Sequence, residues 1–286
     1  IRRQEIPVQG VLLYGLARDM VLGMRVVQAT GERVRCGGKV IKNVSGYDMN
    51  KVFIGSLGTL GIITEVTFKL LPRPATRATV AGAFADLGQA TAVVTRVLES
   101  FLLPEAMELL DAACMASAPA LGLAGSSGYG LAVSLAGSAE TVERQAREFA
   151  QYFSEGRVVR VATLSAEQSP AAWREARDVL DRAVGGEDAV RLKIGAPIGQ
   201  TGALVAKADA FLRRNGWPGA ITAHAGSGVV RAACRIARGG LPGVGIRADR
   251  EQRLDGNPLA GNFSNDVRQE RLGGDDPGAR GRCAAR

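Results

Sequence analysis

Alternating apolar and polar side chains in residues 62–70 predict a β-strand. Ile62, Val66 and Phe68 fall on one side of such a strand, because successive side chains of a strand point to opposite faces. This mainly apolar row is expected to face a core. Two prolines follow within four residues and remove backbone donors, so we expect the strand to end and a domain boundary to fall near Pro74.

Beyond this boundary, strands are expected to alternate with amphipathic helices. Apolar positions recur every three to four residues between Leu87 and Phe101 and predict a helix. Ser138 can cap a helix that reaches Phe153, and Ser169 is expected to be an N-cap followed by proline at the first helical position. Strands are expected at residues 78–84, 105–110, 129–135, 158–163, 189–194 and 221–225, and further helices at 173–184 and 200–214. This order fits an α+β unit of ferredoxin-like type.

Residues 21–27 and 33–35 flank a short stretch that contains Gly31, which predicts a β-hairpin. Arg191 and Lys193 alternate within the strand expected at 189–194, so they point to the same face. Two interpretations of this pair remain open. It is either an exposed charged row or a cationic wall near an anionic substrate or cofactor.

Three glycines precede the strand at residue 62. Gly55, Gly58 and Gly61 recur every third residue, and glycine allows the backbone to adopt positive φ and to approach a ligand closely. Ser56 and Thr59 add hydroxyl donors, and successive amides of such a loop can surround an anion. The spacing differs from that of a P-loop or a Rossmann turn. The loop either binds phosphate or needs glycine only to enter the strand.

Four runs of the sequence carry a longer and more specific pattern: ARDMVLG at 17–23, KNVSGYD at 42–48, GSLGTLGI at 55–62 and LPRP at 71–74. In these runs the chain resembles the flavoprotein family that includes vanillyl-alcohol oxidase, D-lactate dehydrogenases and the glycolate oxidase D and E subunits. The resemblance implies an α+β fold. Residues 1–74 would form the second half of a vanillyl-alcohol-oxidase-type FAD-binding domain, and residues 75–238 a ferredoxin-like cap domain over the flavin.

The resemblance also implies FAD as the cofactor. In that family the matching run holds the pyrophosphate through backbone amides and hydroxyls, and a residue at the strand entry meets the adenine. The FAD-lining positions expected on this basis are Gly46, Tyr47, Ser56, Gly58, Thr59, Gly61 and Ile62. Leu57 stands where D-type subunits usually carry glutamate, which favours similarity to the E subunit.

Both ends of the chain depart from the family pattern. The family places a first FAD-binding half before the segment that begins here, so the chain is expected to be truncated at its N-terminus and to bind FAD weakly. Residues 239–286 are rich in glycine, arginine and aspartate with little apolar periodicity. We expect a poorly ordered tail there, and a reading-frame shift in the gene would explain it.

The single histidine, His224, ends the strand expected at 221–225 and precedes two glycines. By composition alone it is a packing or hydrogen-bonding residue. Related catalytic flavoproteins carry a His-x-Gly-Asp-Gly-Asn-x-His pattern near the flavin, and here Ser227 replaces the aspartate and Arg231 the second histidine. We therefore expect no metal site and keep His224 only as a weak candidate beside the flavin.

Composition excludes several other classes of protein. No apolar stretch approaches the roughly 18–20 residues that span a bilayer, and a cytoplasmic protein is expected, with attachment to the inner membrane only through partner subunits. The four cysteines are scattered without C-x-x-C pairs, unlike zinc or iron–sulfur ligands. The net charge of +8 is spread along the chain without interleaved aromatic residues, which argues against nucleic-acid binding.

Three functions are considered. The first is the FAD-binding subunit of a glycolate-oxidase-like complex that oxidises glycolate or a related 2-hydroxy acid to the 2-oxo acid. A D-type flavin subunit would perform the chemistry, and an iron–sulfur subunit would pass electrons to a quinone. The second is a non-catalytic assembly subunit that keeps the fold without flavin, and the third is a stand-alone D-lactate-dehydrogenase-like enzyme.

Overall fold

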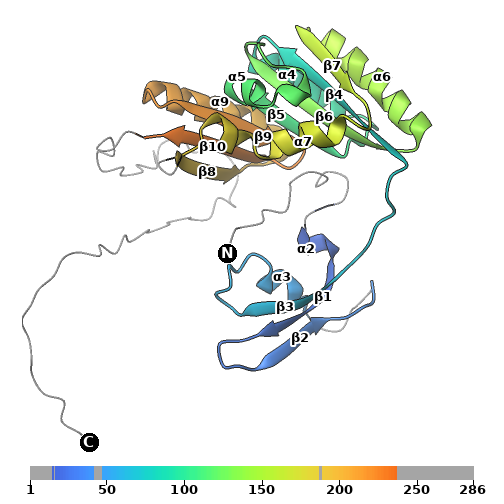
Figure 1. The fold of residues 1–286 in the computed structure, drawn as a ribbon, viewed down its shortest axis with the longest axis vertical. Helices are drawn as coiled ribbons and strands as arrows, with labels where there is room; N and C mark the ends of the chain where they lie inside the picture. Colours follow the sequence, from blue (N-terminus) through green and yellow to red (C-terminus); the bar gives the residue numbers. More distant parts are fainter. Residues whose placement is uncertain (1–14, 16, 42–46, 187–188, 237–286) are drawn as a thin grey trace, which may run out of the picture. The chain divides into compact units, whose positions relative to one another are not determined.

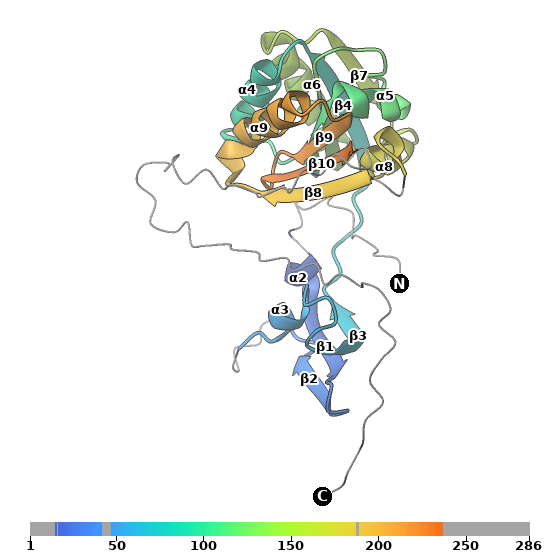
Figure 2. The ribbon, with the colours of Figure 1, turned by 90° about the vertical axis from the view of Figure 1, so that its left-hand side faces the viewer.

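The computed structural model describes residues 15, 17–41, 47–186 and 189–236. They form a three-stranded sheet within residues 17–68 and a seven-stranded sheet within residues 76–235 (Figures 1 and 2). The predicted tail at residues 239–286 and the predicted FAD-lining Gly46 lie outside the described residues.

The smaller sheet has the order β2-β1-β3, and both of its strand pairs are antiparallel. Its elements are α2 (Ala17–Met20), β1 (Val21–Val27), β2 (Arg33–Gly37), α3 (Asn50–Phe53) and β3 (Ile62–Phe68). The predicted hairpin is confirmed, and Gly31 occupies its turn with φ of 83°, a conformation that glycine adopts without steric cost.

The predicted strand at residues 62–70 is also confirmed, but its apolar row is largely exposed. Val66 packs against the core of the small sheet, whereas Ile62 is 68% and Phe68 52% exposed. The expectation of a buried row was therefore wrong for most of the strand. The physical reason is the size of the core, which consists of the buried side chains Met24, Val26, Cys36 and Phe53.

The larger sheet has the order β7-β4-β6-β5-β9-β10-β8. Its strands are β4 (Thr76–Phe84), β5 (Ala106–Asp111), β6 (Tyr129–Gly137), β7 (Arg160–Leu164), β8 (Ala189–Gly195), β9 (Gly219–His224) and β10 (Val229–Arg235). Its helices are α4 (Leu87–Leu98), α5 (Ala112–Ser117), η1 (Pro119–Leu121), α6 (Ala139–Glu155), α7 (Ser169–Arg177), α8 (Val179–Ala183), η2 (Ile198–Gln200) and α9 (Thr201–Arg214).

The succession β4-α4-β5-β6-α6-β7 with strand order β7-β4-β6-β5 is the predicted ferredoxin-like topology. Strands β9, β10 and β8 extend this sheet beyond β5 through antiparallel pairs. Ser138 caps α6 as predicted, because its hydroxyl accepts from the amide of Thr141. Strand β10 and helix α5 were not predicted.

Hydrophobic side chains fill both faces of the large sheet. On one face, residues of the strands pack against α4, α6 and α9, and Phe84, Phe149 and Phe153 are fully buried there. On the other face, alanines and leucines of the strands pack against α5, η1, α7 and α8. A strand that is covered on both faces has a nearly continuous apolar sequence. Strand β6 is an example.

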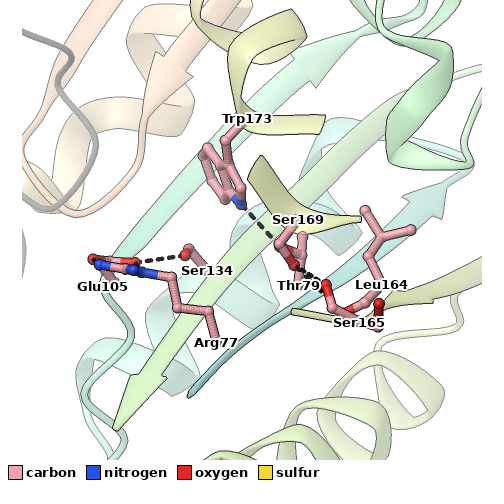
Figure 3. A network of polar contacts seen from close by, with 8 residues as sticks. All are labelled: Arg77, Thr79, Glu105, Ser134, Leu164, Ser165, Ser169 and Trp173. Carbon is pink, nitrogen blue, oxygen red and sulfur yellow. Dashed lines mark hydrogen bonds and ion pairs between the residues drawn. The ribbon is translucent and has the colours of Figure 1, made fainter. Parts of the chain in front are cut away.

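Ser169 corrects one prediction about helix starts. It is the first residue of α7, whose N-cap is Gln168 without a side-chain hydrogen bond. The Ser169 hydroxyl is buried, donates to the carbonyl of Ser165 and accepts from the hydroxyl of Thr79 on β4. The indole of Trp173 donates to the same threonine (Figure 3). Ser169 thus links α7 to the sheet by hydrogen bonds. Helix α7 ends before Asp178, and α8 begins after it.

Candidate functional site

The loop between α3 and β3 folds back on the carbonyl of Ser56. This oxygen accepts from the amide of Thr59 at 3.0 Å and from the Thr59 hydroxyl at 2.7 Å. The amide of Ser56 donates to the carbonyl of Phe53. Within the described part of the chain, the hydroxyl of Ser56 has no hydrogen-bond partner and is open to a ligand, whereas that of Thr59 already closes the turn.

Three residues of this loop adopt left-handed backbone conformations. Gly55, Leu57 and Gly58 have φ of 89°, 55° and 82°, and a Cβ atom at either glycine would meet nothing within 4 Å. The amides of Leu57 and Gly58 find no backbone acceptor among the described residues. Free backbone amides of successive residues can surround an anion.

Gly61 has a different role from the other two glycines. A Cβ atom there would lie 2.7 Å from Cγ1 of Val26 and 2.8 Å from the carbonyl oxygen of Val27. Packing against β1 therefore already requires glycine at this position. Of the other predicted FAD-lining residues, Ile62 opens β3 and Tyr47 lies before α3 with 94% of its surface exposed.

A second polar region lies on the face of the large sheet that carries α5, α7 and α8. Residues directly opposite each other in an antiparallel pair share a face, and the register places Thr222 opposite Arg231, and Arg231 opposite Lys193. The buried carboxylate of Glu108 accepts from the Thr222 hydroxyl at 2.5 Å and from Nη2 of Arg231 at 3.0 Å. We call Glu108, Lys193, Thr222, His224 and Arg231 the polar cluster.

His224 belongs to this cluster, since it pairs with Glu108 across β5 and β9. It is 1% exposed, and its Nδ1 lies 2.8 Å from Oγ of Ser227. Its Nε2 is buried without a partner among the described residues. Burial lowers the pKa of His224, the carboxylate of Glu108 opposes this and the charge of Arg231 reinforces it. The imidazole is therefore neutral at pH 7.

Polar contacts continue on the neighbouring strands. Arg77 of β4 binds the carboxylate of Glu105 through Nε and Nη2, both at 3.2 Å. The hydroxyl of Ser134 donates to the same carboxylate at 2.9 Å (Figure 3). This ion pair is bidentate, and such pairs hold both side chains in a defined geometry. The charges of Arg77 and Glu105 therefore neutralise each other.

The sequence singled out Arg191, Lys193 and His224 but did not predict the roles of Glu108 and Arg231 in the polar cluster. Glu108 lies in the strand predicted at 105–110, and a carboxylate inside an apolar strand was a signal that a buried partner exists. Arg231 was noted only as a substitute for a histidine. Their pairing joins residues 123 positions apart, which no local pattern can predict.

Neither a metal cluster nor a membrane-spanning helix is found in the described ranges. No group of three histidine, cysteine or acidic side chains there could hold a metal ion. None of the helices in these ranges is long and apolar enough to cross a bilayer. Cys36, Cys114 and Cys234 are buried free thiols, and burial raises the pKa of each, so they are poorly reactive.

The family model of FAD linked oxidases, C-terminal domain, matches residues 73–238, which is more than half of the chain. The chain belongs to the FAD-linked oxidase family. Its cofactor is FAD, as expected from the sequence. The loop fits this cofactor, because the amides of Leu57 and Gly58 have no backbone acceptor among the described residues, and Gly55 and Gly58 leave open space beside the backbone that suits a pyrophosphate.

The chain is similar in sequence to several known proteins. Glycolate oxidase subunit GlcD of Bacillus subtilis is 36% identical over 169 residues, which are 58% of this chain and 36% of that protein. Glycolate oxidase subunit GlcE of Escherichia coli is 50% identical over 60 residues, 21% of this chain and 17% of that protein. D-lactate dehydrogenase of Anaerostipes hadrus is 41% identical over 98 residues, 34% and 21% of the two chains. The matches thus span about a third or less of these relatives.

Solved structures show the same fold. Alkyldihydroxyacetonephosphate synthase aligns with a TM-score of 0.56 at 16% identity and covers 81% of this chain and 47% of its own. p-Cresol methylhydroxylase aligns with a TM-score of 0.54 at 18% identity and covers 76% and 51%. The predicted vanillyl-alcohol-oxidase-type α+β fold is confirmed.

Proposed function

We propose that this chain is the E-type FAD-binding subunit of a glycolate-oxidase-like complex. The complex would oxidise glycolate or a related 2-hydroxy acid to the 2-oxo acid. The observation that carries the proposal is the loop at residues 55–61, with its left-handed glycines and free amides. Leu57 in place of glutamate and the local identity with GlcE support the E type.

In this proposal the chain binds and orients the cofactor. The amides of Leu57 and Gly58 and the hydroxyl of Ser56 hold the pyrophosphate, Thr59 keeps the turn closed, and Ile62 meets the adenine. Gly46 and Tyr47 line FAD from the segment before α3. Flavin supplies the hydride chemistry when bound. The incomplete histidine pattern around His224 assigns the reaction of the hydroxy acid to a D-type flavin subunit, with an iron–sulfur subunit as electron acceptor.

The test is FAD binding by the full chain, alone and with its D-type and iron–sulfur partners. Gly58→Ala places a methyl group on the open surface that would receive the pyrophosphate, whereas Gly31→Ala adds the same group at φ of 83° in the β1–β2 turn, also in open space. Both substitutions carry a similar backbone strain of about 1 kcal/mol. We expect Gly58→Ala alone to reduce the FAD released on denaturation.

Other outcomes would select a different function. A folded chain that joins its partners but carries no flavin would indicate the assembly subunit. Equal FAD loss in Gly31→Ala and Gly58→Ala would contradict the loop as the pyrophosphate site. The similarity to D-lactate dehydrogenase supports a stand-alone enzyme as second candidate, which oxidation of D-lactate by the isolated chain would establish.

A further inference from the structure

Positive side chains gather on the face of the small sheet that points away from its core. Along β1, Met24 and Val26 are buried in the core, so Arg25 between them points to the opposite face. The register places Arg35 of β2 on one side of Arg25 and Glu65 of β3 on the other. Arg25 therefore lies between a like charge and an opposite charge on this outer face.

Two hollows are found on this outer face, and Arg25, Arg35 and Glu65 line both of them. The larger has a volume of about 550 Å³ and is also lined by Arg33. The smaller has a volume of about 150 Å³ and is also lined by Lys39. All five charged side chains are exposed. We call these residues the basic face: Arg25, Arg33, Arg35, Lys39 and Glu65.

The charges of the basic face are not balanced. Glu65 binds Arg25 at 3.3 Å, whereas Arg33, Arg35 and Lys39 form no ion pair within the described residues. Four cations and one carboxylate leave an excess of three positive charges. Because like charges directly opposite each other destabilise a sheet, the pair of Arg25 and Arg35 opposes folding. A local feature that opposes folding without filling a core is expected at a functional surface.

The surroundings of these charges favour an acidic protein surface over other anions. Val27 lies directly opposite Arg33 and lines the larger hollow, and the aliphatic stems of arginines add apolar contact area. Protein interfaces combine apolar contacts with arginine in this way. Neither hollow is lined by an aromatic ring on which a nucleic-acid base could stack. A second copy of the chain would bring two positive faces together, which is unfavourable.

We propose that the basic face docks this chain onto an acidic surface of a partner subunit, whose carboxylates are bound by Arg33, Arg35 and Lys39. Guanidinium groups suit this role, because they bind carboxylates in bidentate geometry. The identity of the partner as a subunit of the same complex rests on the proposed function. The basic face gives that function an assembly surface, and it includes none of the residues proposed to bind FAD.

Binding of the full chain to the D-type and iron–sulfur subunits, measured by biolayer interferometry at low and high salt, tests the docking surface. The double variant Arg33→Glu, Arg35→Glu is expected to raise the Kd at least about tenfold at low salt. High salt should weaken wild type more than this variant, because it screens the charges. The control Arg147→Glu, Lys207→Glu makes the same charge change at exposed positions of α6 and α9 and should leave the Kd unchanged.

Arg35→Gln separates docking from folding. It removes the like charge opposite Arg25, so the thermal midpoint of the chain should stay the same or rise. The same change removes a proposed contact with the partner, and the Kd is expected to rise about threefold. A fall in the thermal midpoint that accounts for weaker binding would show that Arg35 serves the fold, and it would overturn its docking role. The FAD content should not change in any of these variants.

The outcomes separate this inference from the proposed function. Assembly that depends on the basic face, in a complex whose E-type chain carries no flavin, would remove the proposed FAD-binding role and keep the docking surface. Flavin binding by a complex in which the Arg33→Glu, Arg35→Glu variant binds as tightly as wild type would overturn the docking surface alone. Absence of binding between the wild-type chain and both subunits also overturns it. A dimer of the isolated chain that the double variant dissociates would identify a second copy as the occupant instead.

Discussion

The three-stranded and seven-stranded sheets differ in how much of their apolar side-chain surface is buried. Phe53 is the largest side chain in the core of the small sheet, and Ile62 and Phe68 stay exposed on its outer strand. In the large sheet, helices cover both faces and Phe149 and Phe153 are fully buried. Because burial of apolar area drives folding at roughly 25 cal/mol per Å², the large sheet should hold most of the stability of the described chain.

Core truncation is expected to give the largest effect. Phe153→Ala removes a ring that packs edge to face against Phe84 and Phe149, with centroids at 5.5 and 6.4 Å. We expect the free energy of unfolding to fall by about 3–5 kcal/mol, measured by urea denaturation. Phe53→Ala is the matched change in the small core. It should speed amide exchange in β1–β3 and leave β4–β6 protected; equal acceleration in both sheets would show that they unfold as one unit.

The loss of a polar contact should also lower the free energy of unfolding more in the large sheet than in the small sheet. Asp111 caps α5 through the amide of Cys114 and also accepts from the amide of Ile221 on β9. Asp111→Ala leaves both donors without this acceptor, and a loss of about 2–3 kcal/mol is expected.

Asn50 in the small sheet gives the comparison for Asp111. Its Nδ2 donates to the carbonyl of Leu22, but its buried Oδ1 has no partner among the described residues. Asn50→Ala removes one contact and one unsatisfied atom, so the net change should be under about 1 kcal/mol. Denaturation midpoints of the two variants test this, and a similar loss in both would contradict it.

A histidine in the large sheet makes stability depend on pH. The pKa of His224 in the folded chain lies below its ordinary value of 6.5, so the unfolded chain binds the proton first as the pH falls. The free energy of unfolding should therefore decrease below about pH 6.5, by no more than about 1.4 kcal/mol per pH unit, until the folded pKa is reached.

His224→Gln isolates this effect, since the chain has no other histidine. The difference between wild type and His224→Gln should shrink or change sign between pH 7.5 and 5. A constant difference across that range, from urea titrations at each pH, would show that burial does not alter this titration.

The smallest effect is expected from backbone strain. Leu57 in the loop and Arg157 after α6 are the two non-glycine residues with φ between 50° and 65° among those described. Relief of left-handed strain by Leu57→Gly or Arg157→Gly, less the added entropy of glycine, should raise stability by about 0.5–1 kcal/mol. If the loop holds FAD in this conformation, only Leu57→Gly should also change flavin content, because it loosens the anion site.

Local patterns predicted most elements but not all of their surroundings. The hairpin at residues 21–35, the helix that follows Ser138 and the ferredoxin-like order are confirmed, because each depends on periodicity, capping or turn chemistry within a short stretch. β10 was missed since its arginine and alanines lack strong strand character. The buried row expected in β3 was wrong because local alternation does not reveal whether anything covers a face.

The amino-acid sequence by itself determined the family, the cofactor and the succession of strands and helices, since these reside in contiguous motifs and in the spacing of apolar residues. Only the tertiary structure decided which charges meet. It paired Arg231 with Glu108 and Arg191 with Asp181, and among the described residues it gave Lys193 no ion pair. The reason is physical. Strand order and register place distant residues on one face of a sheet, and only there does low dielectric make the pairing of a buried charge decisive.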